Sequence, residues 1–356
     1  MLGLWSGGGP AVLAALGKPS LYVDDLHGGS GEFLTAYSAA RRAGWKVAPV
    51  SSSRFSDVTD AVRAMQVLKE LRSLTILDVT ERDPGKAAAA VEDVYGAKVK
   101  VVNADGINRA YQQASAAEGK KWAQEWIKGA VKVVEPSVGE IEKSGRMYVA
   151  MENLMQEHQT PACTVDCLSL FYAGKMPAYP CMGFFQMGND ARIGACEGDL
   201  RSTLTMVLMT RLTGRPGYIS DPVIDTSKNQ IIYAHCVASN KVYGPNGPAN
   251  PYYIRDHSED RKGASVRSVM PVGEMTTTLE FDPIKKAMII HTAKTVDNIE
   301  EDKACRTKLA AEVKDFDSLL AEWDQLWWRS VTYYGDYRRE AGTLAALLGF
   351  KTVREG

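Results

Sequence analysis

The chain has 356 residues, and its 42 basic and 43 acidic side chains leave a formal net charge of −1. With neither a basic excess nor a basic block, this composition argues against a nucleic acid or an anionic membrane surface as a partner. No apolar run approaches the ~20 residues that a membrane-spanning helix needs, and the length suits two or three domains.

The first half of the chain alternates between short apolar runs and longer amphipathic segments. Such alternation is typical of a parallel sheet with helices on its faces. In chain order, the expected helices span 57–71, 86–95, 105–130 and 137–157, and the expected strands span 74–79, 97–102 and 163–167.

The segment 168–189 is rich in Pro, Gly, Met and aromatic residues and carries no clear helical period. Irregular segments of this kind often line a ligand pocket. A packed connection under a sheet fits the same composition equally well, and the sequence leaves both readings open.

A helix is expected directly after Asp199. Leucines recur every four residues from Leu200 to Leu212, which predicts a helix with one strongly buried face. Asp199 is a good N-cap for this helix, and Gly214 followed by Pro216 is a good stop.

Three polar side chains flank this region, each at the expected end of an element. Glu197 precedes the helix, Asp221 ends the next apolar run, and His235 ends the run after that. Two carboxylates and one imidazole on rigid elements suit a divalent ion such as Mn²⁺ or Mg²⁺. An acidic residue at such a position is also an ordinary helix cap or turn residue, so spacing alone decides neither reading.

The second half changes character beyond His235. Residues 240–263 are expected to form a loop, and alternating residues over 275–281 and 287–291 predict an antiparallel hairpin around Asp282-Pro283. A strand at 331–334 and a helix at 338–348 close the chain. This half therefore reads as a smaller β-rich domain.

Six cysteines are present, and five of them fall between 163 and 236, mostly inside apolar runs. In a chain of this length they indicate reduced, buried thiols and hence a cytoplasmic protein. No Cys-x2-Cys pair occurs, which disfavours a structural zinc site.

Several stretches resemble the superfamily of L-fucose isomerase and L-arabinose isomerase. The most specific is Cys196-Glu197-Gly198-Asp199, with Asp221 twenty-four positions after Glu197 and His235-Cys236 beyond it. Supporting stretches are Thr164-Val165-Asp166-Cys167-Leu168, Tyr334-Gly335-Asp336-Tyr337-Arg338 and Leu347-Leu348-Gly349. The resemblance runs from about Leu74 to the C-terminus.

The resemblance implies an α/β fold, with parallel α/β sheet domains followed by a β-rich, barrel-like C-terminal domain. Its expected boundaries are 1–55 for the remnant of an N-terminal α/β domain, 56–165 for an α/β domain, and 166–356 for the catalytic-type region with the β-rich domain. Relatives usually carry an additional N-terminal α/β domain before the matched part, of which the first residues here look like the tail end or a minimal replacement, and they form trimers or hexamers. A homo-oligomer of this kind is expected here.

The resemblance also implies a function, namely metal-dependent aldose–ketose isomerisation of an open-chain sugar through an enediol. This reaction makes the enzyme an intramolecular oxidoreductase. Glu197 and Asp221 are then the acid/base groups, and with His235 they are ligands of Mn²⁺ or another divalent cation such as Mg²⁺ or Co²⁺. Other sugar chemistry (a lyase, epimerase or hydrolase) and a non-catalytic sugar-binding or assembly protein remain alternatives.

Arg329 departs from the family pattern, because many relatives have a metal-ligating His at this position. A guanidinium has no lone pair for a cation. Arg329 is expected either to pair with Glu197 or Asp221 in place of the ion, or to grip an anionic substrate such as a sugar acid or sugar phosphate. Neutral aldoses such as fucose and arabinose are then expected to be poor substrates. His257, in a polar loop, is a second candidate substrate contact.

Overall fold

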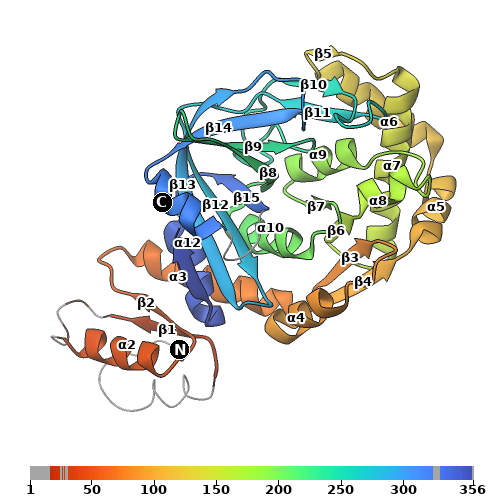
Figure 1. The fold of residues 1–356 in the computed structure, drawn as a ribbon. Coiled ribbons are helices and arrows are strands. Elements are labelled where there is room, and N and C mark those ends of the chain that lie inside the picture. Colours follow the sequence, from red (N-terminus) through yellow and green to blue (C-terminus); the bar gives the residue numbers. More distant parts are fainter. Residues whose placement is uncertain (1–16, 25, 27, 29–30, 324–328, 355–356) are drawn as a thin grey trace.

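The computed structural model describes residues 17–24, 26, 28, 31–323 and 329–354, and it combines parallel α/β layers with a closed antiparallel barrel (Figure 1). The expected fold class is confirmed. Within the described residues, no helix combines the length and the apolar character needed to cross a membrane.

A four-stranded parallel sheet lies in the α/β part, in the order β4-β3-β6-β7. Its strands are β3 (Thr75–Val79), β4 (Lys98–Val102), β6 (Ala162–Val165) and β7 (Ile193–Cys196). The helices between β3 and β6 are α4 (Gly85–Tyr95), α5 (Ala104–Gln113), α6 (Ala116–Gly129) and α7 (Val138–Glu157). The single helix expected over 105–130 is wrong. Ser115 accepts a hydrogen bond from the backbone N–H of Glu118, which caps a new helix and divides the segment in two.

The segment 168–189 is not the irregular loop that its composition suggested. It holds α8 (Cys167–Tyr172) and α9 (Cys181–Asn189), and nearly every residue of α9 is buried against α7 and β7. Of the two readings left open, the packed connection is therefore the one that the structure favours.

Six antiparallel strands close into a barrel in the order β12-β15-β8-β9-β14-β13 and back to β12. The strands are β8 (Tyr218–Asp225), β9 (Gln230–His235), β12 (Met275–Asp282), β13 (Ala287–Asn298), β14 (Thr307–Val313) and β15 (Ser330–Tyr334). The expected hairpin is confirmed as β12 and β13. A further strand, β16 (Lys351–Arg354), pairs in parallel with β13.

The helix after Asp199, α10 (Leu200–Thr213), lies between the parallel sheet and the barrel. It contacts β6 and β7 on one side and β12 and β15 on the other. Its predicted limits are confirmed, since Asp199 accepts the N–H groups of Arg201 and Ser202, and Gly214 ends it at a φ of 69°. The sequence predicted one buried face for this helix, but eleven residues of α10 are buried, and they lie on all of its faces.

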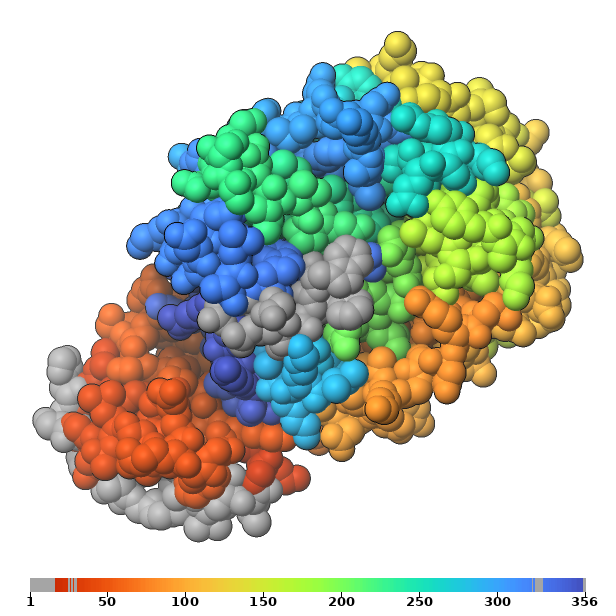
Figure 2. Space-filling model, viewed as in Figure 1, coloured from red at the N-terminus to blue at the C-terminus, as the bar shows by residue number. Residues whose placement is uncertain are grey.

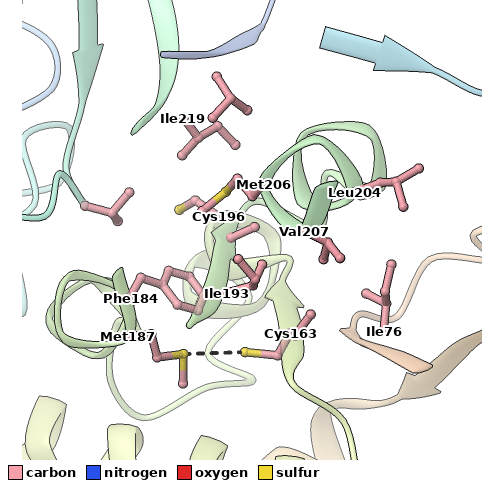
Figure 3. Close-up of a cluster of buried hydrophobic side chains, with 14 of the residues drawn as sticks. Ile76, Cys163, Phe184, Met187, Ile193, Cys196, Leu204, Met206, Val207 and Ile219 are labelled. Atoms are coloured by element: carbon pink, nitrogen blue, oxygen red, sulfur yellow. Dashed lines mark hydrogen bonds between the residues drawn. The ribbon is translucent and has the colours of Figure 1, made fainter. Parts of the chain in front are cut away.

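Apolar packing fixes α10 against the sheet. Figure 3 shows Leu204, Met206 and Val207 of α10 with Ile76 of β3 and Ile193 of β7 in one buried cluster. Because packed interiors leave few voids, the position of α10 is set by these neighbours. The turn that leads into α10 is therefore held from one side by the sheet and from the other by the barrel.

Smaller elements complete the chain. A parallel pair, β1 (Ser20–Val23) and β2 (Val47–Val50), forms a unit with α2 (Glu32–Arg42). Figure 1 and the space-filling view in Figure 2 both show this unit, coloured red, at the edge of the molecule. The remaining elements are α3 (Phe55–Leu71), β5 (Lys132–Val133), β10 (Tyr252–Arg255), β11 (Ser265–Ser268), α11 (Phe316–Glu322) and α12 (Arg338–Leu348). The expected loop 240–263 is thus wrong in part, because β10 pairs there with β5 and β11.

The central position of α10 gives a stability prediction. Leu208 is fully buried, so Leu208→Ala should lower the free energy of unfolding by about 2–5 kcal/mol through lost burial and an unfilled cavity. Leu320, which is 44% exposed on α11, provides the control, and Leu320→Ala should change it by less than about 1 kcal/mol. Urea unfolding followed by far-UV circular dichroism measures both. Equal shifts in the two variants would contradict the central role of α10.

Candidate functional site

The chain leaves β7 through an unusual turn. Glu197 has a φ of 65° and Gly198 a φ of 63°, both in the left-handed region. This region is uncommon for a residue with a side chain and is often found at functional sites. The left-handed φ favours glycine at Gly198, where an added Cβ would also lie 2.8 Å from Nη2 at the end of the Arg82 side chain.

The structure brings Glu197, Asp221, His235 and Arg329 together where the parallel sheet meets the barrel. Nε2 of His235 lies 3.7 Å from Oε1 of Glu197 and 3.9 Å from Oδ2 of Asp221. His235 is the last residue of β9, as expected, whereas Asp221 lies inside β8 rather than at its end. The predicted convergence of these side chains is therefore found, while their roles stay predictions.

Arg329 lies among three carboxylates. Its Nε donates to Oδ1 of Asp221 at 2.7 Å, its Nη2 donates to Oε2 of Glu197 at 2.5 Å, and its Nη1 lies 3.7 Å from Oδ2 of Asp199. Burial lowers the pKa of the guanidinium, but the three carboxylates outweigh this effect and raise its pKa above the usual range. Pairing with Glu197 and Asp221 is the first of the two expected arrangements.

Each of the two partly exposed carboxylates keeps one oxygen away from Arg329. Oε1 of Glu197 and Oδ2 of Asp221 both face Nε2 of His235, and that nitrogen is buried with no hydrogen-bond partner among the described residues. Three carboxylates around one guanidinium leave an excess of two formal negative charges. The excess negative charge, together with the two carboxylate oxygens and the imidazole nitrogen, fits a divalent cation.

One detail of His235 sets a condition on metal binding. Its Nδ1 accepts the backbone N–H of Cys236 at 2.9 Å, so the neutral ring carries its proton on Nε2. Coordination through Nε2 requires the other tautomer, with the proton on Nδ1 and the contact to Cys236 given up.

His257 lies apart from this group. Its ring stacks on Tyr179 with the centroids 4.5 Å apart, and its Nδ1 is 3.4 Å from Oδ1 of Asp260. The residue is only 7% exposed. Among the described residues, no hydrogen bond or ion pair joins His257 to Glu197 or Asp221, and its proposed substrate contact stays a prediction.

Arg82, which the sequence patterns did not single out, holds the backbone at Glu197. Its Nη2 donates to the carbonyl oxygen of Glu197 at 2.9 Å, and its Nε lies 2.8 Å from Oδ2 of the buried Asp166. Arg82 follows β3 at the carboxyl edge of the parallel sheet, where α/β proteins commonly bind ligands. That placement is the signal that could have drawn attention to it.

Comparison with known proteins gives related names but no family assignment. No family model matches the chain. The sulfoquinovose isomerase of Alkalicoccus urumqiensis is 25% identical over 224 residues, covering 60% of this chain and 49% of that protein. The sulfoquinovose isomerase of Priestia aryabhattai is 23% identical over 221 residues, with coverages of 60% and 49%. That of Clostridium sp. (strain MSTE9) is 35% identical over 95 residues, 26% of this chain and 20% of that protein.

The chain spans about half the length of the first two relatives, 49% in each case. The matches connect the chain with proteins named for a sugar isomerisation.

The surroundings of Arg82 give a pH prediction. Asp78 of β3 is 2% exposed, and burial raises its pKa to about 7, with Arg82 opposing and Asp166 adding to the shift. Because the folded pKa exceeds the unfolded value, the stabilising contribution of the protonated form is complete below about pH 4 and is lost as the pH rises through 7. In the wild type, the free energy of unfolding should therefore decrease by on the order of 4 kcal/mol between about pH 4 and pH 7. Asp78→Asn lacks the titrating group, so this decrease should be absent in the variant.

Urea titrations at several pH values measure this difference for Asp78→Asn and for Asp93→Asn. Asp93, whose side chain is 73% exposed, should leave the pH profile nearly unchanged. A wild-type profile that Asp78→Asn does not alter would contradict the assignment.

Removing Arg329 tests the carboxylate cluster. Arg329→Met should cost about 3 kcal/mol of unfolding free energy, because it leaves the two partly exposed carboxylates of Glu197 and Asp221 and the buried one of Asp199 without their cation. The control is Arg211→Met, which removes a partly exposed pair with Glu70 at the far end of α10 and should cost about 1 kcal/mol or less. Denaturant unfolding at neutral pH measures both, and similar losses would refute a special role for Arg329 in stability.

Proposed function

We propose that this chain acts as a sugar isomerase that interconverts an aldose and a ketose. The observation that carries the proposal is the pair of carboxylate oxygens, Oε1 of Glu197 and Oδ2 of Asp221, which face the same nitrogen of His235 at 3.7 and 3.9 Å. The names of the relatives support the same class of reaction. Two carboxylates on facing elements are what a proton transfer between neighbouring carbons needs.

The reaction is a 1,2 shift of hydrogen. One carboxylate accepts the proton from C2 of the open-chain aldose, and the C2–H electron pair forms the double bond of an enediol as the C1 oxygen gains a proton. Return of a proton to C1, with loss of the proton on the C2 oxygen, gives the ketose. We assign these transfers to Glu197 and Asp221, and the pair fits the task because both side chains are partly exposed, at 21% and 26%.

Arg329 acts here as a positioning residue. Its guanidinium fixes one oxygen of Glu197 and one of Asp221, so that the other oxygen of each is directed to a common space. Its side chain is 5% exposed and all three of its nitrogens face carboxylates. For this reason we propose positioning, rather than the direct grip on an anionic substrate that the sequence suggested as one possibility.

A divalent cation belongs to this proposal as cofactor, with Mn²⁺ as the first ion to test. Glu197, Asp221 and His235 would hold it, in line with their donor chemistry. When bound, the ion supplies a positive charge that polarises the sugar oxygens at C1 and C2.

An anionic sugar is the first substrate to test, because sulfoquinovose, which names the relatives, is a hexose that carries a sulfonate. The experiment incubates the purified chain with sulfoquinovose, L-fucose or L-arabinose in D2O with Mn²⁺. Proton NMR then follows both ketose formation and deuterium uptake at C1 and C2. We expect conversion of the sulfonated aldose and much slower conversion of the neutral sugars.

Matched variants identify the groups that move the proton. Glu197→Gln and Asp221→Asn should each lower kcat by about 10²-fold or more, the usual size of a general acid–base contribution. Asp225→Asn is the control, since Asp225 lies on the same strand with its side chain 31% exposed and pairs with Lys228 rather than with Arg329. Absence of both conversion and deuterium uptake with every aldose would refute the proposed function, as would full activity in Asp221→Asn.

A further inference from the structure

Cys196 is an unexpected neighbour of the carboxylate cluster. Consecutive side chains of an extended strand point to opposite faces, but the left-handed φ of Glu197 turns the chain directly after Cys196. A ligand atom from Cys196, one from Glu197 and one from His235 consequently lie within 4.8 Å of one another. Sulfur, oxygen and nitrogen donors from two different parts of the fold thus meet around one point.

A second observation points to a ligand at this place. Nε2 of His235 is buried and has no hydrogen-bond partner among the described residues, although polar atoms in a protein interior are nearly always satisfied. His235 is 2% exposed and Cys196 is 4% exposed. An unpartnered nitrogen beside a carboxylate and a thiol has the composition of a metal site rather than that of a packed core.

We propose that Cys196 is a thiolate ligand in this site. The site then takes a borderline divalent ion such as Zn²⁺ or Co²⁺ through Cys196, Glu197 and His235, and holds it more tightly than Mn²⁺ or Mg²⁺. The choice follows from donor softness, because thiolate and imidazole favour Zn²⁺ and Co²⁺, whereas Mn²⁺ and Mg²⁺ prefer oxygen. The inference rests on the proposed function only in that it concerns the same site. It adds Cys196 to the ligands expected there.

The binding step balances without any redox partner. The S–H bond of Cys196 breaks, its proton passes to the buffer, and the sulfur electron pair forms the bond to the ion. Sγ of Cys167 lies 3.2 Å from Sγ of Cys196, and either sulfur can be the donor of this contact. Partners that orient a ligand in this way tune metal affinity. The hydrogen bond with Cys167 and burial raise the pKa of the Cys196 thiol, so binding of the ion must supply the free energy that removes its proton.

The ligand atoms must move closer together for an ion to bind, since those of Cys196, Glu197 and His235 lie within 4.8 Å of one another. Nε2 of His235 must also lose its proton as Nδ1 gives up the contact to Cys236. With bonds of about 2.3 Å to sulfur and about 2.0 Å to nitrogen or oxygen, ligand atoms of a tetrahedral site lie roughly 3.3–3.6 Å apart. Nε2 of His235 and Oε1 of Glu197 are already 3.7 Å apart, and Oδ2 of Asp221, 3.9 Å from the same nitrogen, offers a further oxygen. Arg329 does not obstruct this arrangement, since it binds Oε2 and Oδ1.

Cobalt spectroscopy tests the ligand directly. The full chain, stripped with a chelator, is titrated with Co²⁺ while the near-ultraviolet sulfur-to-cobalt charge-transfer band and the visible bands are recorded. We expect the charge-transfer band to saturate at one ion per chain, to be displaced by Zn²⁺, and to persist in a large excess of Mn²⁺. Cys196→Ser should abolish the band and weaken Zn²⁺ binding by at least about tenfold.

Cys163→Ser is the matched control. Cys163 lies on the neighbouring strand β6 and is also buried, and its Sγ lies 3.9 Å from Sδ of Met187 (Figure 3). It should keep the full cobalt band. If Cys196→Ser does not fold, X-ray absorption of the wild-type Zn²⁺ protein decides instead, because a Zn–S shell near 2.3 Å identifies a thiolate ligand.

The outcomes separate this inference from the proposed function. Cobalt that binds without a charge-transfer band, or a zinc edge with only nitrogen and oxygen neighbours, overturns the thiolate ligand even if the chain isomerises sugars. A cobalt band that depends on Cys196 supports the ligand even if no aldose is converted. A band that survives in Cys196→Ser and vanishes in Cys163→Ser also overturns it.

Discussion

One buried guanidinium joins the two parts of this molecule. Arg329, directly before β15 of the barrel, binds Asp221 on β8 and Glu197 beyond β7 of the parallel sheet, and lies close to Asp199, the cap of α10. Acidic groups this close together are stable only when a cation accompanies them. The same contact that holds sheet and barrel together therefore also gathers the polar atoms of the candidate site.

The rigidity of that site comes from α10. Because the helix is buried all round, the Glu197–Gly198 turn at its start cannot shift without disturbing the cores on both sides. Arg82 also holds this turn in place, because its guanidinium donates a hydrogen bond to the backbone carbonyl oxygen of Glu197. Fixed placement of reacting groups before the substrate arrives is a main source of rate enhancement in enzymes.

Local signals in the sequence predicted local structure well. The cap at Asp199, the stop at Gly214 and the β12–β13 hairpin each depend on a few neighbouring residues, and all three are present. The packed helix α9 and strand β14 were missed, because their burial depends on partners far along the chain. The meeting of Glu197, Asp221 and His235 followed from the family resemblance, whereas the approach of Cys196 to them depends on one backbone angle that no spacing rule reveals.

The strand pairing of the barrel also has a consequence for how the site comes into being. β15 pairs with β8 across about 110 residues of chain, as in the register of Ser330 with Ser220, and Arg329 reaches Glu197 across 132 residues. Contacts so distant in sequence form late and slowly, since the entropy of closing the loop must be lost first. A refolding chain thus has its helices and hairpins long before it has this cluster. Any activity of the cluster therefore reports that β15, the last strand of the barrel in chain order, has been placed.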